Sequence, residues 1–182
     1  MSRLSGVGLG WRSHSGWAVL VVAAGTPASP RVLARERVQL VDEPLPRMAY
    51  HAIQADELSA RDGKALITKV RRAATTAATK ATKKVAKEFD IAAVAVVGKV
   101  RNIPDDLQRI LAAHALLHAA EGALYEEAIL EAAARADLPA VLVEERAIDI
   151  SAALDVAGKQ LGPPWQKDHK LAATAALLAV NE

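Results

Sequence analysis

Residues 3–24 read R-L-S-G-V-G-L-G-W-R-S-H-S-G-W-A-V-L-V-V-A-A, and this stretch decides the fold that the sequence predicts. Val7–Gly10 and Trp17–Ala24 are rich in Val, Leu and Trp, residue types that favour strands. The polar segment between them predicts a tight turn, so the stretch indicates a hairpin. The side chains expected in that turn are Trp11, Arg12, Ser13, His14, Ser15 and Gly16.

Length and composition bound the class of protein. With 182 residues and 52% hydrophobic residues, the chain predicts one domain, 1–182, with its own core. It has no cysteine, which excludes disulfides and thiolate metal sites. We find no signal-peptide pattern and no apolar run of about 20 residues, so a soluble cytoplasmic protein is expected. The net charge is only +2, so any interaction with nucleic acid must depend on where the charges cluster.

The chain beyond the hairpin continues as strand and then helix. Gly25–Pro30 reads as a turn, and Arg31–Val41 approximates the alternation of a third strand. These three strands predict an antiparallel meander. Apolar residues at helical spacing then predict a helix over Ala55–Glu88.

A basic stripe follows one side of this predicted helix. At 100° per residue, five basic side chains fall beside the apolar face, and residues 64–87 contain no acidic residue. Such a stripe has two interpretations, a solvated helix surface or a nucleic-acid contact. Its members are Lys69, Arg72, Lys80, Lys83 and Lys87.

The second half alternates strand and helix. The apolar run Ile91–Val97 predicts a central strand, and a long helix is expected from Pro104 to about Arg135. Pro139–Val143 reads as another buried strand. Asp149–Lys159 suggests a short helix, and Trp165–Val180 a well-buried final one. The predicted order is βββαβαβα, an α/β fold with a mixed five-stranded sheet and helices on both faces.

A polar group interrupts the apolar stripe of the long helix. His114, His118 and Glu121 are spaced by four and three residues, which places them on one face. Such a group can bind a metal such as Zn²⁺, although the H-E-x-x-H pattern of zinc hydrolases is absent. The other interpretation is a hydrogen-bonded network in the core or at an interface.

The order of elements and three local features resemble the ribonuclease H-like superfamily, and within it Holliday-junction resolvases of the RuvC type. Residues 6–18 are similar to the opening G-x-D-x-G…T-G-W-x-V of those resolvases, and residues 91–98 to their fourth strand. Residues 168–173, D-H-K-L-A-A, resemble the start of their final helix. The resemblance implies a ribonuclease H-like domain and a dimer interface that includes the long helix. The strings at residues 12–19, 118–125 and 162–170 also resemble small uncharacterised bacterial proteins, and that resemblance brings no known activity with it.

The acidic residues that the resemblance requires are mostly missing. RuvC-type nucleases hold divalent cations with acids on the first strand, at the end of the fourth strand and on the last helix. Here those places carry Gly8, Gly98 and Asp168, so Asp168 is the one catalytic position that keeps its acid. One carboxylate is a poor Mg²⁺ site, and nuclease activity is not expected.

Basic residues are expected around the same point, which would then attract an anion. We predict an anion site at Arg12, His14, Lys99, Arg101 and Lys170, with Gly8 and Gly98 leaving room for the ligand. Asp168 is expected to pair with Arg12 or Lys99 instead of holding a metal.

Together these observations favour a non-catalytic homodimer that binds an anionic partner, in particular DNA or RNA. No membrane contact and no resident cofactor are expected, the alternative cofactor being a divalent metal. The rival functions are a metal-dependent hydrolase or nuclease and a protein-interaction scaffold.

Overall fold

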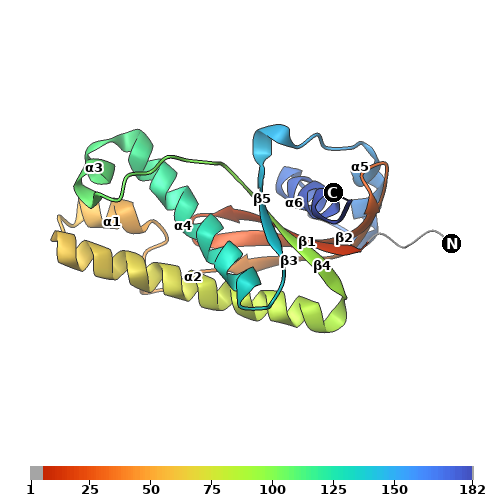
Figure 1. The fold of residues 1–182 in the computed structure, drawn as a ribbon, viewed down its shortest axis with the longest axis horizontal. Coiled ribbons are helices and arrows are strands. Elements are labelled where there is room, and N and C mark those ends of the chain that lie inside the picture. The colour runs from red at the N-terminus through yellow and green to blue at the C-terminus, as the bar shows by residue number, and fades with distance from the viewer. Residues whose placement is uncertain (1–5, 182) are drawn as a thin grey trace.

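The structure is a computed structural model that describes residues 6–181, and its centre is a five-stranded mixed sheet (Figure 1). The strands lie in the order β3-β2-β1-β4-β5. β1 pairs antiparallel with β2 and parallel with β4. β3 pairs antiparallel with β2, and β5 pairs parallel with β4. This confirms the predicted meander followed by two parallel strands. The bounds are β1 Val7–His14, β2 Trp17–Thr26, β3 Ser29–Gln39, β4 Ile91–Gly98 and β5 Ala140–Glu144.

The first hairpin differs from its prediction in the length of β1. The predicted turn over residues 11–16 is wrong, because β1 stays paired with β2 as far as His14 opposite Trp17. Trp11 is fully buried and Ser13 almost so, whereas Arg12 and His14 are half-buried on the other face of the strand. The alternating polar residues are therefore strand residues, and the turn is Ser15–Gly16, with Gly16 at φ 83°. Residues 3–5 of the predicted stretch lie outside the described residues.

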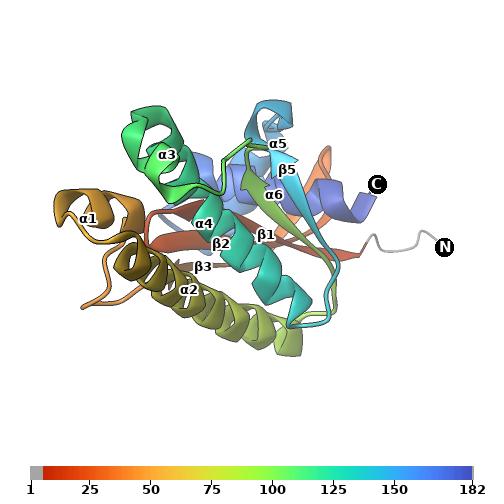
Figure 2. The same ribbon diagram turned by 60° about the vertical axis from the view of Figure 1, so that its left-hand side comes forward.

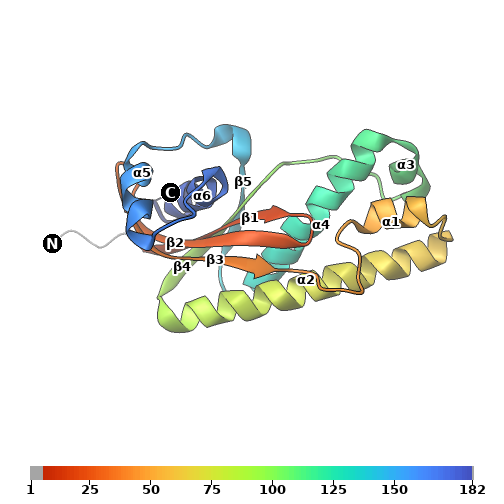
Figure 3. The ribbon, with the colours of Figure 1, turned by 180° about the vertical axis from the view of Figure 1, so that it is seen from behind.

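The helices cover both faces of the sheet. α6 (Lys167–Asn181) crosses one face against β1, β2 and β4, and α5 (Ala153–Ala157) lies on the same side. α2 (Ala60–Glu88) and α4 (His114–Ala134) pack together on the other face (Figure 2). Seen from behind, α2 runs along the β3 edge and extends past the end of the sheet (Figure 3). α1 (Ala49–Ala55) and α3 (Leu107–Ala112) lie beyond that end, joined by a bond from Gln54 to the Leu111 carbonyl.

Two predicted helices are interrupted. The helix expected over 55–88 is two helices, because the Ser59 hydroxyl accepts from the Asp62 amide and begins α2 at Ala60. The helix expected from Pro104 to Arg135 is broken at Ala113, whose φ of −124° and ψ of 110° are extended. The short helix expected at 149–159 is α5 followed by the 3-10 helix η2 (Gly158–Leu161). No helix among residues 6–181 is long and apolar enough to cross a membrane.

Small residues allow α6 to lie directly on the sheet. Ala172 and Ala176 of α6 are fully buried against β1, at positions where β1 carries glycine. A Cβ at Gly8 would lie 2.2 Å from the Ala176 carbonyl oxygen, and one at Gly10 would lie 1.8 Å from that of Ala172. Even alanine would clash at either glycine, so the sequence fixes a very close contact between β1 and α6.

Candidate functional site

The close contact between β1 and α6 corrects one expectation about the site. We predicted that Gly8 leaves room for a ligand, but the backbone of α6 occupies that space. Gly8 faces Ala176, Gly10 faces Ala172, and the next residue on that side of β1, Arg12, meets Asp168. The residue of β1 that contacts Asp168 is therefore Arg12 and not Gly8.

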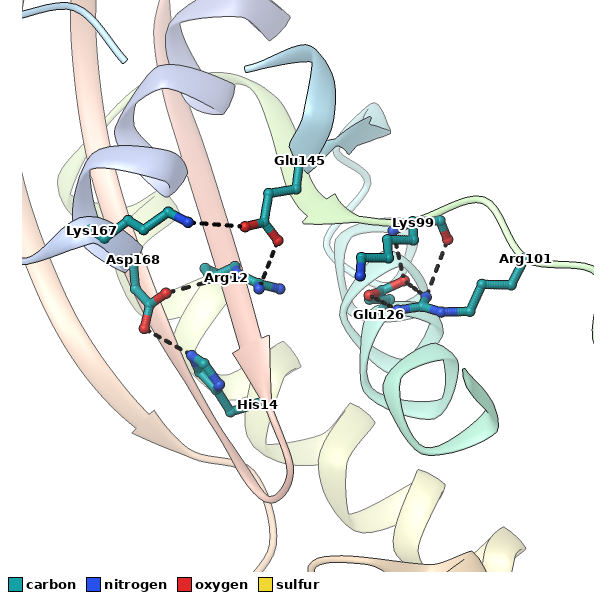
Figure 4. Close-up of polar contacts among 8 residues, drawn as sticks. All are labelled: Arg12, His14, Lys99, Arg101, Glu126, Glu145, Lys167 and Asp168. Carbon is teal, nitrogen blue, oxygen red and sulfur yellow. Dashed lines mark hydrogen bonds and ion pairs between the residues drawn. The ribbon is translucent and has the colours of Figure 1, made fainter. Parts of the chain in front are cut away.

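Arg12 lies between two carboxylates at the carboxyl end of β1 (Figure 4). Its Nη2 donates to Glu145 Oε2 at 2.8 Å, and its Nε lies 3.8 Å from Asp168 Oδ1. His14 Nε2 contacts Asp168 Oδ2 at 2.8 Å, and Lys167 Nζ lies 3.5 Å from Glu145 Oε1. This confirms the expected pairing of Asp168 with Arg12. The cluster holds two carboxylates and two fixed positive charges, so it has no surplus charge to attract an anion or a cation.

A second ion pair lies at the end of β4, separate from the first (Figure 4). Arg101 donates to Glu126 at 2.5 and 3.0 Å, and the Lys99 amide donates to the same carboxylate at 3.4 Å. Glu126 is buried, and a Cβ at Gly98 would lie 2.6 Å from its carboxyl carbon. Gly98 thus leaves room for an acid of α4 and not for a ligand.

The five residues predicted to bind an anion do not share one site. Arg12, His14 and Arg101 line one hollow of about 190 Å³, in which Glu126 and Glu121 are also present. Lys99 lies outside that hollow, and Lys170 pairs with Asp155 at 2.5 Å. The anion site stays a prediction, but its arginines are already paired with carboxylates.

The histidine face of α4 forms a polar network within the domain. Glu121 Oε1 accepts from the backbone amide of His51 at 3.0 Å and contacts His51 Nδ1 at 3.1 Å. The Nε2 atoms of His114 and His118 lie 2.9 Å apart, so one donates to the other. Among residues 6–181 no group of three or more His, Asp or Glu side chains is placed to hold a metal ion. The metal interpretation of His114, His118 and Glu121 therefore gains no support.

The basic stripe lines a groove on the surface of the domain. It has a volume of about 1300 Å³ and lies between α2 and the edge strand β3, and residues 42–45 also line it. Aliphatic side chains such as Val38 and Leu40 line it beside the charges, and no aromatic residue does. Its basic residues are Arg37, Lys69, Arg72, Lys80, Lys83, Lys84 and Lys87, and its acidic ones Glu36, Asp42 and Glu43.

Few of these basic groups have a partner. Lys84 Nζ lies 2.9 Å from Glu36, and that hydrogen bond raises the pKa of Lys84. The guanidinium of Arg37 lies over the ring of Trp17 at 3.9 Å. Within residues 6–181 no ion pair or hydrogen bond involves the side chain of any of the five predicted stripe residues. The groove is thus a site of unneutralised positive charge.

Sequence reasoning missed the acids that neutralise the first two clusters. Glu145 follows β5 in the 3-10 helix η1 (Glu145–Ala147), and Glu126 lies inside α4, so neither is close in sequence to its arginine. Glu126 is followed directly by Glu127, so the sequence does not single it out as the buried acid. The contact of His51 with Glu121 spans 70 residues and has no local signal.

The fold is similar to that of a bacterial RuvC protein. The structure of Thermus thermophilus RuvC matches with a TM-score of 0.51 and 17% identity over 94% of this chain and 91% of that one. T. thermophilus RuvC in complex with a Holliday junction substrate matches with a TM-score of 0.49 and 16% identity, over 94% and 90% of the chains. No family model and no curated protein matches the sequence. At this identity the similarity concerns the fold alone, and it confirms the predicted RuvC-like, ribonuclease H-like fold.

Proposed function

We propose that this chain is a non-catalytic ribonuclease H-like domain that binds the phosphate backbone of nucleic acid in the groove between α2 and β3. The observation that carries the proposal is the charge of that groove: without Arg37, whose guanidinium lies over Trp17, six basic side chains line it against three acidic ones. Phosphate contacts need such exposed Lys and Arg groups and need no base recognition. Because no aromatic side chain lines the groove, it offers no platform on which bases could stack.

The spacing of the basic groups suits a phosphate chain. Lys69 and Lys87 are 18 residues apart on one helix, which corresponds to about 27 Å at a rise of 1.5 Å per residue. Neighbouring members of the stripe that are three or four residues apart lie about 4.5–6 Å from each other along the axis. This is close to the separation of successive phosphates along one strand.

Binding is tested by fluorescence anisotropy with labelled DNA and RNA oligonucleotides over a range of salt concentrations. We expect affinity to fall linearly with salt on a log–log scale, and reversal of Lys80, Lys83 and Lys87 to Glu to abolish binding. The matched control reverses three exposed basic residues outside the groove, Arg61, Lys64 and Lys159, which changes the net charge equally. Equal losses in both triple variants, or no binding by the wild type at low salt, would refute the groove.

The absence of catalysis is proposed on the geometry of β1. The side chain beside Asp168 is a guanidinium, and α6 fills the space at Gly8. A divalent cation would meet Arg12 between the two carboxylates that would have to bind it. We expect no cleavage of duplex, junction or hybrid substrates with Mg²⁺ or Mn²⁺. Cleavage that disappears in Asp168→Asn would contradict this part of the proposal.

One observation favours a second candidate, the binding of a protein segment. β3 is an edge strand whose outer side is unpaired within the described residues, and Val38 and Leu40 line the groove beside it. An extended acidic segment could add to such an edge. It would compete with oligonucleotides in the anisotropy experiment. The predicted homodimer also stays a prediction, and light scattering of the full chain tests it.

A further inference from the structure

The two walls of the groove between α2 and β3 differ in charge. Among the described residues that line it, those of α2 include six basic side chains and no acidic one: Lys69, Arg72, Lys80, Lys83, Lys84 and Lys87. The wall formed by β3 and the segment after it carries the acids Glu36, Asp42 and Glu43. Its basic residue Arg37 has its guanidinium over the ring of Trp17. The positive charge of the groove therefore lies along one line, on the helix side.

The groove is also narrow. Lys84 on α2 and Glu36 on β3 reach each other across it, with Nζ 2.9 Å from Oε2. Lys69 and Lys87 both line it and are about 27 Å apart along the helix, so about 1300 Å³ corresponds to a mean width of about 7 Å. One phosphate–sugar chain fits this width. A double helix does not, because its major groove alone is about 12 Å wide.

A double helix that lay over the groove would meet the acidic wall. Its second row of phosphates runs about 6 or about 12 Å from the first, across the minor or the major groove of the duplex. If the first row follows the basic side chains of α2, the second lies on the β3 side, where Glu36, Asp42 and Glu43 repel it. A single strand has no second row of phosphates and avoids this repulsion.

We propose that the groove selects single-stranded nucleic acid, bound with its phosphates against α2 and its bases directed outward. The inference rests on the proposed function and names its substrate class. No aromatic side chain is among the described residues that line the groove, so recognition depends on shape and charge and not on base stacking. The pair of Lys84 and Glu36 is exposed on both sides and therefore weak, so a phosphate can displace Glu36.

The test compares the binding of labelled oligo-dT, oligo-U and a mixed-sequence DNA duplex of equal length, by fluorescence anisotropy at low salt. Charge alone favours the duplex, which carries one phosphate for about every 1.7 Å of its axis. We expect instead that the single strands bind at least about ten-fold more tightly, with a log–log salt slope of about −3.5, or about −0.7 for each of five phosphates. The ratio of the oligo-dT and oligo-U affinities shows whether the strand is DNA, RNA or either.

A variant separates the acidic wall from net charge. It neutralises the three acids of the β3 wall: Glu36→Gln, Asp42→Asn and Glu43→Gln. We expect its duplex affinity to rise more than its single-strand affinity, so that the preference for single strands falls by at least about three-fold. The matched control neutralises three exposed acids outside the groove and should leave the preference unchanged: Asp105→Asn, Asp137→Asn and Asp149→Asn.

The outcomes separate this inference from the proposed function. If the wild type binds duplex as tightly as single strands or more tightly, the inference is overturned. If reversal of Lys80, Lys83 and Lys87 still abolishes that binding, the groove itself stands. An equal fall of the preference in both triple variants also overturns the inference. No binding of any oligonucleotide refutes the proposed function and the inference with it. The wild-type comparison decides even if the acid variant does not fold.

Discussion

Charged side chains lie in pairs around the ends of β1 and β4, whereas most of those in the groove between α2 and β3 have no partner. Arg12 and Arg101 each meet a carboxylate within 2.8 Å. In the groove Lys84 has an ion pair and Arg37 stacks on Trp17, and the five stripe residues have neither contact within residues 6–181. The resemblance to ribonuclease H-like nucleases led us to expect the functional site at the ends of β1 and β4. In this chain the unneutralised charge lies in the groove between α2 and β3, so we expect ligands to bind there.

The largest expected effect is a loss of stability when a side chain is added where β1 lies against α6. A Cβ at Gly10 would lie 1.8 Å from the backbone oxygen of Ala172, which no side-chain movement can relieve. Gly10→Ala should therefore lower the free energy of unfolding by about 3 kcal/mol or more, or prevent folding. Chemical denaturation measures the change. Gly63→Ala in α2 is the control, because its Cβ would meet only side-chain atoms at 3.1 Å or more, and it should change stability by about 1 kcal/mol at most.

The next effect separates a buried ion pair from an exposed one. Arg101→Ala leaves Glu126, whose side chain is 6% exposed, without its cation, and should cost about 3 kcal/mol. Arg135→Ala removes an exposed partner of Glu131 and should cost about 0.5 kcal/mol. Both are measured by urea denaturation. Similar costs for the two variants would show that water reaches Glu126 in solution and that the carboxylate is not buried at the end of β4.

The basic stripe could be located from the sequence and the paired clusters could not, for a physical reason. The stripe lies on one helix, where a period of 100° places Lys69 and Lys87 from local sequence alone. The neutral clusters depend on partners 133 and 25 residues away, Glu145 for Arg12 and Glu126 for Arg101. The order of strands was predictable from the apolar runs, but the extension of β1 was missed because polar side chains alternate with buried ones at residues 11–14.

A smaller effect tests whether charge in the groove is limiting. Glu36 contacts Lys84 across the groove, and Glu36→Gln should free that lysine for phosphate. Because both groups are exposed, we expect a gain of about two- to five-fold in oligonucleotide affinity at low salt. Glu88→Gln changes the net charge equally but lies outside the groove lining, and should have a smaller effect. A loss of affinity in Glu36→Gln would show that the pair positions Lys84.

The smallest expected effect is a pH dependence of stability that comes from His169 in the first turn of α6. Burial lowers the pKa of His169, and the charge of Arg35 lowers it further. The neutral ring accepts a hydrogen bond from the Gln166 amide through Nδ1 at 3.1 Å. The unfolded chain therefore binds a proton at this histidine more readily than the folded one does, so stability falls as the pH drops below 6.5, the ordinary value. In His169→Gln, where the amide oxygen can still accept that bond, this part of the pH dependence should disappear. Denaturation curves of both proteins across this range measure it. The opposite result would be a wild type that gains stability relative to the variant as the pH falls through the same range. It would mean that Asp168 stabilises the protonated ring of His169 and is not fully engaged by Arg12.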